Sequence, residues 1–444
     1  MFKLHPIPDA DFCCPFCEGA LQPQGWYMPG MRILADLRCD DCDQEYYGDL
    51  PSGHGLCFPM LLNKTTGEVW DQYQASWFAS WLHVGYRDRQ KTPVPFTSEE
   101  FRPIRQPIVL NCLDAMYGHG LLKLVHAQHY LDYYQEYDLI VIVPRWLRWL
   151  VPQDVAAIWT IDLPLRQGHE WNDWIAQEIQ QRLAQFDHGW LASAYAHSFS
   201  ELHVERFTQI QPFPIEEWDD QLNQLTVTFI WREDRLWVDS HIQQWRDRRF
   251  PGRLGRMWKK LAAQWFPALQ EQTQQVIQLA EQLRQCYPQI RFVIAGLGKA
   301  GGLPDWITDL RTQTITEDVE RSWCELYAQS QVIVGIHGSN MLLPSAHAAT
   351  VIELMPNDRL GNVMQDLLLI PEAESRFAVF RYRFVPLESS PQVIAATIKS
   401  MIQTLPFAMI YLKSFQQTPC FNQPEVVTKR YRQSRLRELA RPAS

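Results

Sequence analysis

The sequence of 444 residues has little of what marks a membrane, secreted or nucleic-acid-binding protein. Acidic residues outnumber basic ones by 50 to 41 and the formal net charge is −9, whereas nucleic acids and anionic membranes attract proteins with an excess of positive charge. No uncharged apolar run approaches the roughly 18 residues that a membrane helix requires. The first ten residues also lack the basic and apolar regions of a secretory signal. We therefore expect a cytoplasmic chain with no transmembrane segment and no nucleic-acid partner.

What is present is the composition of a globular protein of two or three domains, with 46% hydrophobic and 20% charged residues. The sequence contains ten cysteines. Because cytoplasmic thiols stay reduced, we interpret them as metal ligands, redox groups or buried apolar side chains rather than as disulfides.

Four cysteines form two C-x-x-C pairs, Cys14 with Cys17 and Cys39 with Cys42, separated by 21 residues. This spacing is typical of two tight turns that present four thiolates to one structural Zn²⁺. The alternative is a single redox C-x-x-C, which would be expected inside a βαβ pattern that does not surround Cys14. Cys13 competes with Cys14 for the first ligand position, but only Cys14 has the correct gap to Cys17.

The segment 1–62 around these cysteines has only three basic residues, Lys3, Arg32 and Arg38, and three times as many acidic ones. A phosphate-binding surface needs the opposite charge, so we expect a structural or protein-binding zinc ribbon. The acidic pair at Asp41 and Asp43 has the D-x-D pattern of metal-dependent glycosyltransferases. It lies inside the proposed zinc turn and is rejected as a separate metal site.

Beyond this segment, short apolar runs alternate with longer amphipathic stretches, first over about 108–207 and again over about 225–401. A Pro-rich, acidic stretch at 211–220 separates the two sets. The pattern predicts an α/β protein with two Rossmann-like domains. We predict strands at 107–112, 138–144, 156–163, 202–207, 225–231, 291–295, 331–336 and 350–355. We predict helices at 121–134, 172–186, 254–286, 317–329 and 392–401, and a turn at 117–120.

The most informative motif lies at the end of a predicted strand, in the run VIVGIHGSNMLLP. Here Gly338 would let the backbone approach a ligand, and Ser339 or Asn340 would begin a helix whose N-terminus can bind phosphate. His337 can donate to phosphate, and Glu353, at the end of the next strand, can bind a ribose. A tight turn whose histidine is satisfied by backbone is the competing interpretation.

This motif resembles the donor-site signature of family 61 glycosyltransferases, approximately G-x-H-G-A-x-L-x-N…P…v-x-E. Gly335, His337, Gly338 and Glu353 occupy the matching positions, whereas Ser339 and Asn340 depart from the family pattern. The resemblance covers some 25 residues and implies a GT-B architecture, in which two Rossmann-like domains face a cleft. It also implies metal-independent, inverting transfer of a sugar from a nucleotide-sugar donor to a hydroxyl of a glycan or other acceptor.

With this resemblance, the chain divides into a zinc ribbon (1–62), a linker or docking segment (63–107), an acceptor domain (108–218), a donor domain (219–412) and a C-terminal tail (413–444). In the donor domain, Arg232, with Arg235 second, follows the first strand and is expected to neutralise the leaving diphosphate. The alternative is a solvated loop in which these arginines form salt bridges with Glu233 and Asp234. In the acceptor domain, His119 is the candidate general base and Asp114 the alternative.

Three other interpretations stay open. One is a catalytically silent GT-B-like scaffold whose ribbon recruits a partner. The second is an NAD(P) oxidoreductase, because Gly296, Gly298 and Gly301 fit G-x-G-x-x-G. The third concerns the basic tail 429–439, which can make a weak peripheral contact with anionic lipid.

We also single out Trp146 and Trp149, after a strand end, as candidates to stack on sugars.

Overall fold

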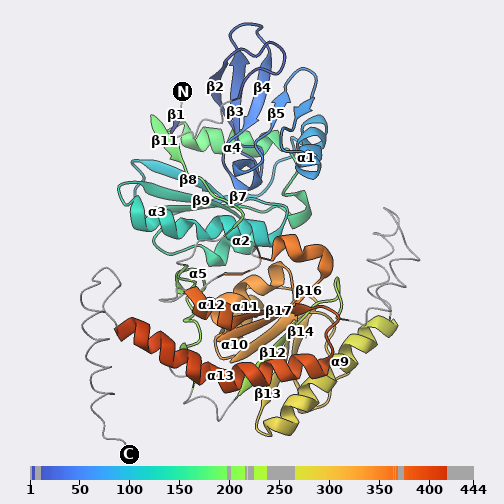
Figure 1. Ribbon diagram of the computed structural model, residues 1–444. Helices are drawn as coiled ribbons and strands as arrows, with labels where there is room; N and C mark the ends of the chain where they lie inside the picture. The colour runs from blue at the N-terminus through green and yellow to red at the C-terminus, as the bar shows by residue number, and fades with distance from the viewer. Residues whose placement is uncertain are drawn as a thin grey trace, which may run out of the picture.

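The computed structural model describes residues 3–5, 12–197, 202–215, 218, 225–237, 266–363, 365, 367–368 and 375–417. This part of the chain forms three β-sheets that lie one above another, from the N-terminal sheet at the top of Figure 1 to the C-terminal sheet at the bottom. The class is α/β, as predicted, with a small antiparallel sheet preceding two larger, mostly parallel ones.

The N-terminal sheet is an antiparallel meander of five strands in the order β2-β3-β4-β5-β6. Its strands are β2 (Leu21–Tyr27), β3 (Leu34–Cys39), β4 (Glu45–Asp49), β5 (Leu61–Asn63) and β6 (Val69–Trp70). The sheet therefore continues past residue 62, where the ribbon was expected to end.

The segment 63–107, expected as a linker, is largely structured. Helix α1 (Ser76–Arg87) buries Phe78 and Leu82 against the N-terminal sheet. Strand β7 (Phe96–Glu100) pairs antiparallel with β10 at the edge of the second sheet. Because β7 is a solvated edge strand, its sequence FTSEE contains no apolar run. No strand was therefore predicted there.

The second sheet has the order β1-β11-β8-β9-β10-β7 and is parallel except for β7. Its remaining strands are β1 (Lys3–His5), β8 (Pro107–Asn111), β9 (Asp138–Pro144), β10 (Ala157–Ile161) and β11 (His188–Leu191). Its strands bury both faces: Ile108 and Leu110 point toward the third sheet, whereas Val109 points toward the N-terminal sheet. This double burial explains the continuous apolar runs in the sequence.

The third sheet is entirely parallel, in the order β14-β13-β12-β15-β16-β17. Its strands are β12 (Thr226–Trp231), β13 (Arg291–Leu297), β14 (Thr308–Thr312), β15 (Val332–Ile336), β16 (Thr350–Met355) and β17 (Tyr382–Pro386). Numbered within the sheet, the order is 3-2-1-4-5-6, which is that of a doubly wound dinucleotide-binding sheet.

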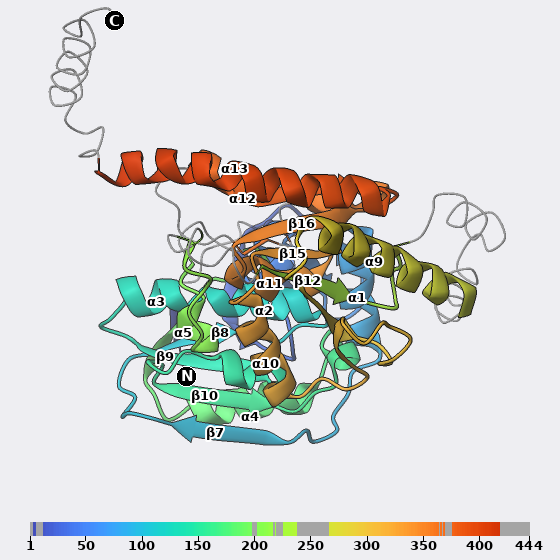
Figure 2. The same cartoon turned by 90° about the horizontal axis from the view of Figure 1, so that it is seen from below.

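The helices form layers around these sheets. Figure 2 shows α9 and α13 on the outer face of the third sheet, and α2, α10 and α11 between the second and third sheets. Helix α4 packs between the N-terminal sheet and the second sheet. The bounds of the helices are α2 (Tyr117–Val125), α3 (Ala127–Tyr133), α4 (Asp173–Leu183), α5 (Glu205–Thr208), α9 (Phe266–Cys286), α10 (Glu317–Tyr327), α11 (Leu342–His347), α12 (Ser375–Arg381) and α13 (Pro391–Gln417). The 3₁₀ turns are η1 (Gly53–Leu56), η2 (Arg145–Leu150), η3 (Leu165–Gln167), η6 (Ser339–Met341) and η7 (Asn357–Asn362).

Two predicted elements were wrong. The turn expected at 117–120 is the first turn of α2, and the strand expected at 202–207 is replaced by the short helix α5. Strands β11, β14 and β17 were not predicted; β14 and β17 are the two edge strands of the third sheet and are partly exposed. Part of the helix expected over 254–286, and the basic segment 429–439, lie outside the described residues. No helix in the described ranges combines the length and apolar character needed to cross a bilayer.

Candidate functional site

The third sheet reverses its strand order between the neighbouring strands β12 and β15. The chain leaves β12 at Arg232 and leaves β15 at His337, so both residues lie at the same edge of the sheet. In open parallel sheets, ligands bind outside the carboxyl ends of the strands at such a reversal. The two segments singled out from the sequence therefore meet at the place where a ligand is expected.

Arg232 connects these two segments directly. Its Nη1 donates to Asn340 Oδ1 at 2.7 Å and to the His337 carbonyl at 3.1 Å. Its Nε and Nη2 donate to the two carboxylate oxygens of Asp234 at 2.8 and 2.6 Å. A guanidinium held by such a bidentate pair has a fixed orientation, so Arg232 presents its charge at a defined place beside the loop after β15.

Arg235 reinforces this charge. Its Nη1 also donates to the His337 carbonyl, at 2.6 Å. Burial lowers the pKa of Arg235, and the neighbouring positive charges of Arg232 and Arg359 lower it further. A bound anion would relieve this repulsion, because opposite charge favours the ionised form.

The two glycines of the motif have different roles. Gly338 has φ +149°, and a Cβ there would overlap Arg232 Nη1 and lie 3.0 Å from Asn340 Oδ1. Gly335 lies within β15, where a Cβ would overlap Met341 Sδ and lie 3.0 Å from Ile230 Cβ. Gly338 therefore permits the arginine contact, whereas Gly335 permits internal packing and contacts no cavity.

His337 and Glu353 form a buried pair behind this loop. His337 Nδ1 lies 2.6 Å from Glu353 Oε2, and both side chains are 1% exposed. Glu353 lines neither of the cavities described below. The expectation that Glu353 binds a ribose is therefore not met by its position; its carboxylate instead orients the His337 ring.

Ser339 and Asn340 begin a short helical segment, as expected. A 3₁₀ turn, η6, leads into α11, which has only six residues. The dipole of so short a helix is small, so the arginines are the stronger source of positive charge. A Cβ on Gly118 of α2 would come within 2.7 Å of Ser339 Cβ, which shows how closely the two sides of the site approach.

On the side of the second sheet, Asp114, His119 and Lys123 form a charged cluster. Asp114 carboxylate oxygens lie 3.5 Å from His119 Nδ1 and 3.4 Å from Lys123 Nζ. Burial alone would raise the pKa of Asp114, but Lys123 and His119 together lower it to about 2. Asp114 is thus an ionised, 6% exposed carboxylate that faces His119, a poor general base but a good partner for an imidazole.

The tautomer of His119 follows from its other contact. The amide Nε2 of Gln365 lies 3.3 Å from His119 Nε2. An amide nitrogen can only donate, so His119 Nε2 accepts and the ring proton lies on Nδ1, toward Asp114. A histidine in this state has the free electron pair that a general base requires.

Two cavities meet at Arg232 and Ser339. The first, of about 470 Å³, has His54, Trp77 and His119 on one side and Arg235 and Arg359 on the other. The second, of about 430 Å³, is mostly apolar. Its lining includes Tyr117, Trp231, Glu320, Trp323, Tyr327, Leu343 and Pro344. A charged site with an adjoining aromatic cavity can accommodate a ligand that has both an anionic and a planar apolar part.

Several of these residues were not predicted from the sequence. His54 and Trp77 were overlooked because they belong to the N-terminal segment and α1, which no local pattern connects to the third sheet. One signal was present: Gly53-His54-Gly55 repeats the tripeptide Gly118-His119-Gly120. Glu320 accepts from Tyr117 Oη at 2.9 Å and from Trp149 Nε1 at 3.0 Å, across the two larger sheets.

The two tryptophans expected to stack on sugars are already engaged. Trp149 is buried and bonded to Glu320, and Trp146 stacks on Tyr117 with ring centroids 5.2 Å apart. Neither offers a free ring face to the larger cavity, and both pack in the core near the second sheet.

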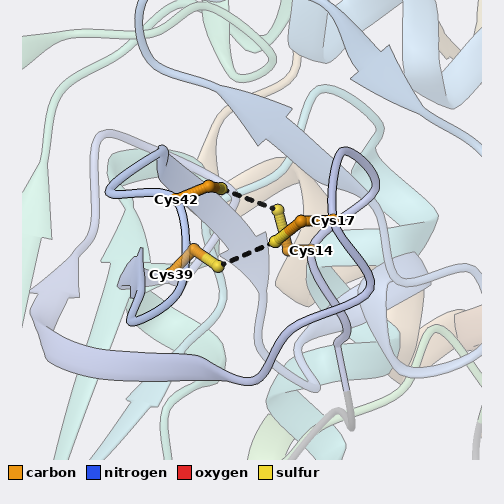
Figure 3. Close-up of side chains that lie close together, drawn as sticks. All are labelled: Cys14, Cys17, Cys39 and Cys42. Atoms are coloured by element: carbon orange, nitrogen blue, oxygen red, sulfur yellow. Dashed lines mark hydrogen bonds between the residues drawn. The ribbon is translucent and has the colours of Figure 1, made fainter.

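The four cysteines expected as metal ligands come together (Figure 3). Their sulfurs lie within 4.8 Å of one another, with Cys14 Sγ 3.6 Å from Cys42 Sγ and Cys17 Sγ 3.4 Å from Cys39 Sγ. Sulfurs on a tetrahedron at the usual Zn–S distance of about 2.3 Å are about 3.8 Å apart. The cluster therefore has the donor set and dimensions to hold a metal ion, and Cys13 is not part of it.

The glycines that suggested an NAD(P) oxidoreductase, Gly296, Gly298 and Gly301, do not lie between a first strand and a helix as a dinucleotide-binding fingerprint does. Gly296 lies near the end of β13, which is the second strand of its sheet in chain order rather than the first. The chain then runs from Gly298 to β14 through a loop, without the helix that would receive a pyrophosphate. A Cβ on Gly298 would lie 2.6 Å from Trp231 and Glu233 side-chain atoms, so these glycines pack against the loop after β12.

Comparisons with known proteins add little. No family model matches the sequence and no curated protein matches it, so the resemblance to family 61 stays a prediction. Among solved structures, the chain is similar to the ADP-heptose lipopolysaccharide heptosyltransferase II of E. coli. The match is 11% identical, covers 67% of this chain and 99% of that chain, and has a TM-score of 0.32. A likeness this weak does not establish a fold, a family or an activity.

Proposed function

We propose that the protein is a glycosyltransferase of GT-B architecture that transfers a sugar from a nucleoside-diphosphate donor to a hydroxyl acceptor. The observation that carries the proposal is the arginine group at the strand-order reversal, in one cavity with a histidine whose Nδ1 lies 3.5 Å from the Asp114 carboxylate. Arg232 and Arg235 converge on the His337 carbonyl, and their cavity is shared with His119. Anion recognition and a general base on opposite sides of one cavity are the two requirements of this transfer.

In the proposed reaction, His119 Nε2 takes the proton of the acceptor hydroxyl, replacing the Gln365 amide contact. The acceptor oxygen forms a bond to the anomeric carbon while the bond between that carbon and the diphosphate oxygen breaks, which inverts the configuration. Asp114 stabilises the imidazolium that forms, because it is already ionised and lies 3.5 Å from His119 Nδ1.

The leaving diphosphate would be bound by Arg232, Arg235 and Arg359. Guanidinium groups match phosphate oxygens in pairs and carry their charge at every physiological pH. They can supply the compensation that a divalent metal supplies in other glycosyltransferases, which is the reason for proposing a metal-independent reaction. The apolar cavity beside Arg232 has room for the nucleoside.

The cysteine cluster is proposed to hold a structural Zn²⁺. Four thiolates complete a tetrahedral shell and leave no position for a substrate or water. Cys14 and Cys39 belong to the same buried cluster as Val109 and Ile140 of the second sheet, so the ion would stabilise the packing of the N-terminal sheet on the second. The dependence on reduced thiols supports a cytoplasmic location.

Calorimetry with UDP, GDP and CMP tests the proposal. We expect at least one nucleotide to bind the wild-type protein and Arg232→Met with Arg235→Met to abolish measurable binding. Arg148→Met is the matched control, because Arg148 makes the same bidentate pair with Glu99, at 2.6 and 2.7 Å, away from both cavities. If none of the three nucleotides binds, the silent-scaffold alternative is the better description; if the control loses binding equally, the arginine assignment is wrong.

A further inference from the structure

The N-terminal segment that carries η1 approaches the charged cluster of the second sheet very closely. Gly53 has φ +56°, its amide donates to the Ala194 carbonyl at 2.7 Å, and a Cβ there would lie 3.3 Å from Lys123 Cδ. Ser52 forms a β-bridge with Ala194, and Ser193 Oγ donates to the Pro51 carbonyl at 3.1 Å. The next residue, His54, is thereby held directly over the cavity that contains His119.

The imidazole of His54 lies edge to face with that of His119, with ring centroids 4.5 Å apart. Both of its ring nitrogens are buried and have no hydrogen-bond partner among the described residues. Burial lowers the pKa of His54 to about 4. The ring is therefore neutral at pH 7 and offers one donor and one acceptor. Buried polar atoms of this kind are normally satisfied by water or a ligand.

Trp77 lies next to His54 and lines the same cavity. The two rings meet edge to face with centroids 5.0 Å apart, and Trp77 is 42% exposed. Its helix, α1, is fixed by buried Phe78, on whose ring the Arg32 guanidinium lies at 3.6 Å. Arg32 is itself paired with Asp49 at 2.6 Å and donates to the Phe78 carbonyl at 2.6 Å. These contacts fix α1, which holds the partly exposed indole ring of Trp77 at the cavity.

We propose that His54 and Trp77 form a subsite for a carbohydrate acceptor, in which His54 hydrogen-bonds a ring hydroxyl while Trp77 covers an apolar face of the sugar, next to His119. We propose a sugar as the ligand because of the two side chains together. A neutral imidazole with both nitrogens available can bind a group that both donates and accepts a hydrogen bond, such as a hydroxyl. An indole face suits the C–H surface of a pyranose.

The charge distribution of the cavity supports a neutral acceptor at this end. Asp114 is compensated by Lys123 and His54 is uncharged, whereas the arginines lie on the opposite side. An anionic group would be drawn to the arginines, which the donor diphosphate is proposed to occupy. That this sugar is an acceptor, rather than only a ligand, rests on the proposed function.

Saturation-transfer NMR with methyl glycosides of glucose, galactose, mannose and N-acetylglucosamine tests the subsite in the presence of each nucleotide of the calorimetry. We expect at least one glycoside to bind, and His54→Phe and Trp77→Leu each to weaken it about five- to tenfold, the effect of one lost contact. His54→Phe keeps an aromatic ring between His119 and Trp77 and removes only the hydrogen bonds. Trp77→Phe, which retains a ring face, is expected to bind better than Trp77→Leu.

Two control variants remove similar side chains elsewhere: Tyr133→Leu on α3, an exposed aromatic, and His188→Gln on β11. Both should bind the glycoside and the nucleotide as the wild type does, and the His54 and Trp77 variants should keep nucleotide affinity. If a nucleotide binds but no glycoside does, or if the His54 and Trp77 variants bind the glycoside unchanged, the subsite is refuted and the donor proposal stands. If glycoside binding depends on these residues but no nucleotide binds, the donor proposal fails and a carbohydrate site remains.

Discussion

Replacing Gly338 with alanine should uncouple Arg232 from the loop after β15. The residue has φ +149°, a conformation that side chains rarely adopt, and the new Cβ would overlap Arg232 Nη1. The guanidinium is the more flexible partner, so we expect it to move away and to lose its contacts with Asn340 and the His337 carbonyl.

The substitution should lower both the folding stability and the affinity for a nucleoside diphosphate, by different amounts. Backbone strain at such a φ costs about 1–3 kcal/mol of folding stability. Hydrogen bonds to a charged group are worth about 1.5–3 kcal/mol, so loss of the oriented Arg232 should weaken binding of a nucleoside diphosphate roughly 10- to 150-fold. The first effect depends on the backbone alone, whereas the second also requires that Arg232 binds the ligand.

Urea denaturation measures the first effect and calorimetry with the nucleotide that binds the wild type measures the second. Gly361→Ala is the control, because Gly361 lies in η7 near the same cavity and a Cβ there meets nothing within 4 Å. A Gly338→Ala protein that matches Gly361→Ala in both stability and affinity would refute the reasoning. Lost stability with unchanged affinity would refute only the role of Arg232 in binding.

Two further predictions concern the metal and the pH dependence of folding. Metal analysis of protein prepared without chelator should give one zinc per chain, and Cys39→Ser should lower both zinc content and stability, whereas Cys13→Ser should change neither; a zinc content near zero in the wild type would contradict the assignment. His347 is fully buried between Leu343 and Thr208, and burial lowers its pKa from 6.5 to about 4. The unfolded state therefore binds the proton more tightly, so stability is intact above about pH 6.5 and falls as the pH drops toward 4, by about 3 kcal/mol at pH 4. Urea denaturation across this range should show the loss in the wild type and in His188→Gln, and a flatter profile in His347→Gln; an equally steep profile in His347→Gln would exclude His347 as its cause.

Features that depend on residues close together in the chain could be predicted from the sequence. The four cysteines were recognisable because a tetrahedral thiolate shell needs two short C-x-x-C turns, and the structure brings the four sulfurs together. Most strands of the two larger sheets were also recognisable, because strands buried on both faces have continuous apolar runs.

The edges of the sheets and the roles of individual residues were harder to predict. β7 and β14 are partly exposed edge strands with polar sequences, so no apolar run identifies them. The sequence places Glu353 at the end of the strand next to His337, but it does not show that the Glu353 side chain is buried against the His337 ring. Asp114 was a plausible base by position alone; Lys123, which makes it a poor one, is nine residues away on α2.

By itself, the sequence determined the α/β class, the cysteine cluster and the residues at the ends of β12 and β15, because each depends on spacing or periodicity within a short segment. Only the tertiary structure decided that Arg232 reaches the His337 loop, since that contact requires β12 and β15, about 100 residues apart, to be neighbours in the sheet. It also decided that His54 and Trp77 line one cavity with His119. Their positions follow from the packing of the N-terminal sheet on the second sheet, a long-range burial of apolar surface that no local pattern in the sequence encodes.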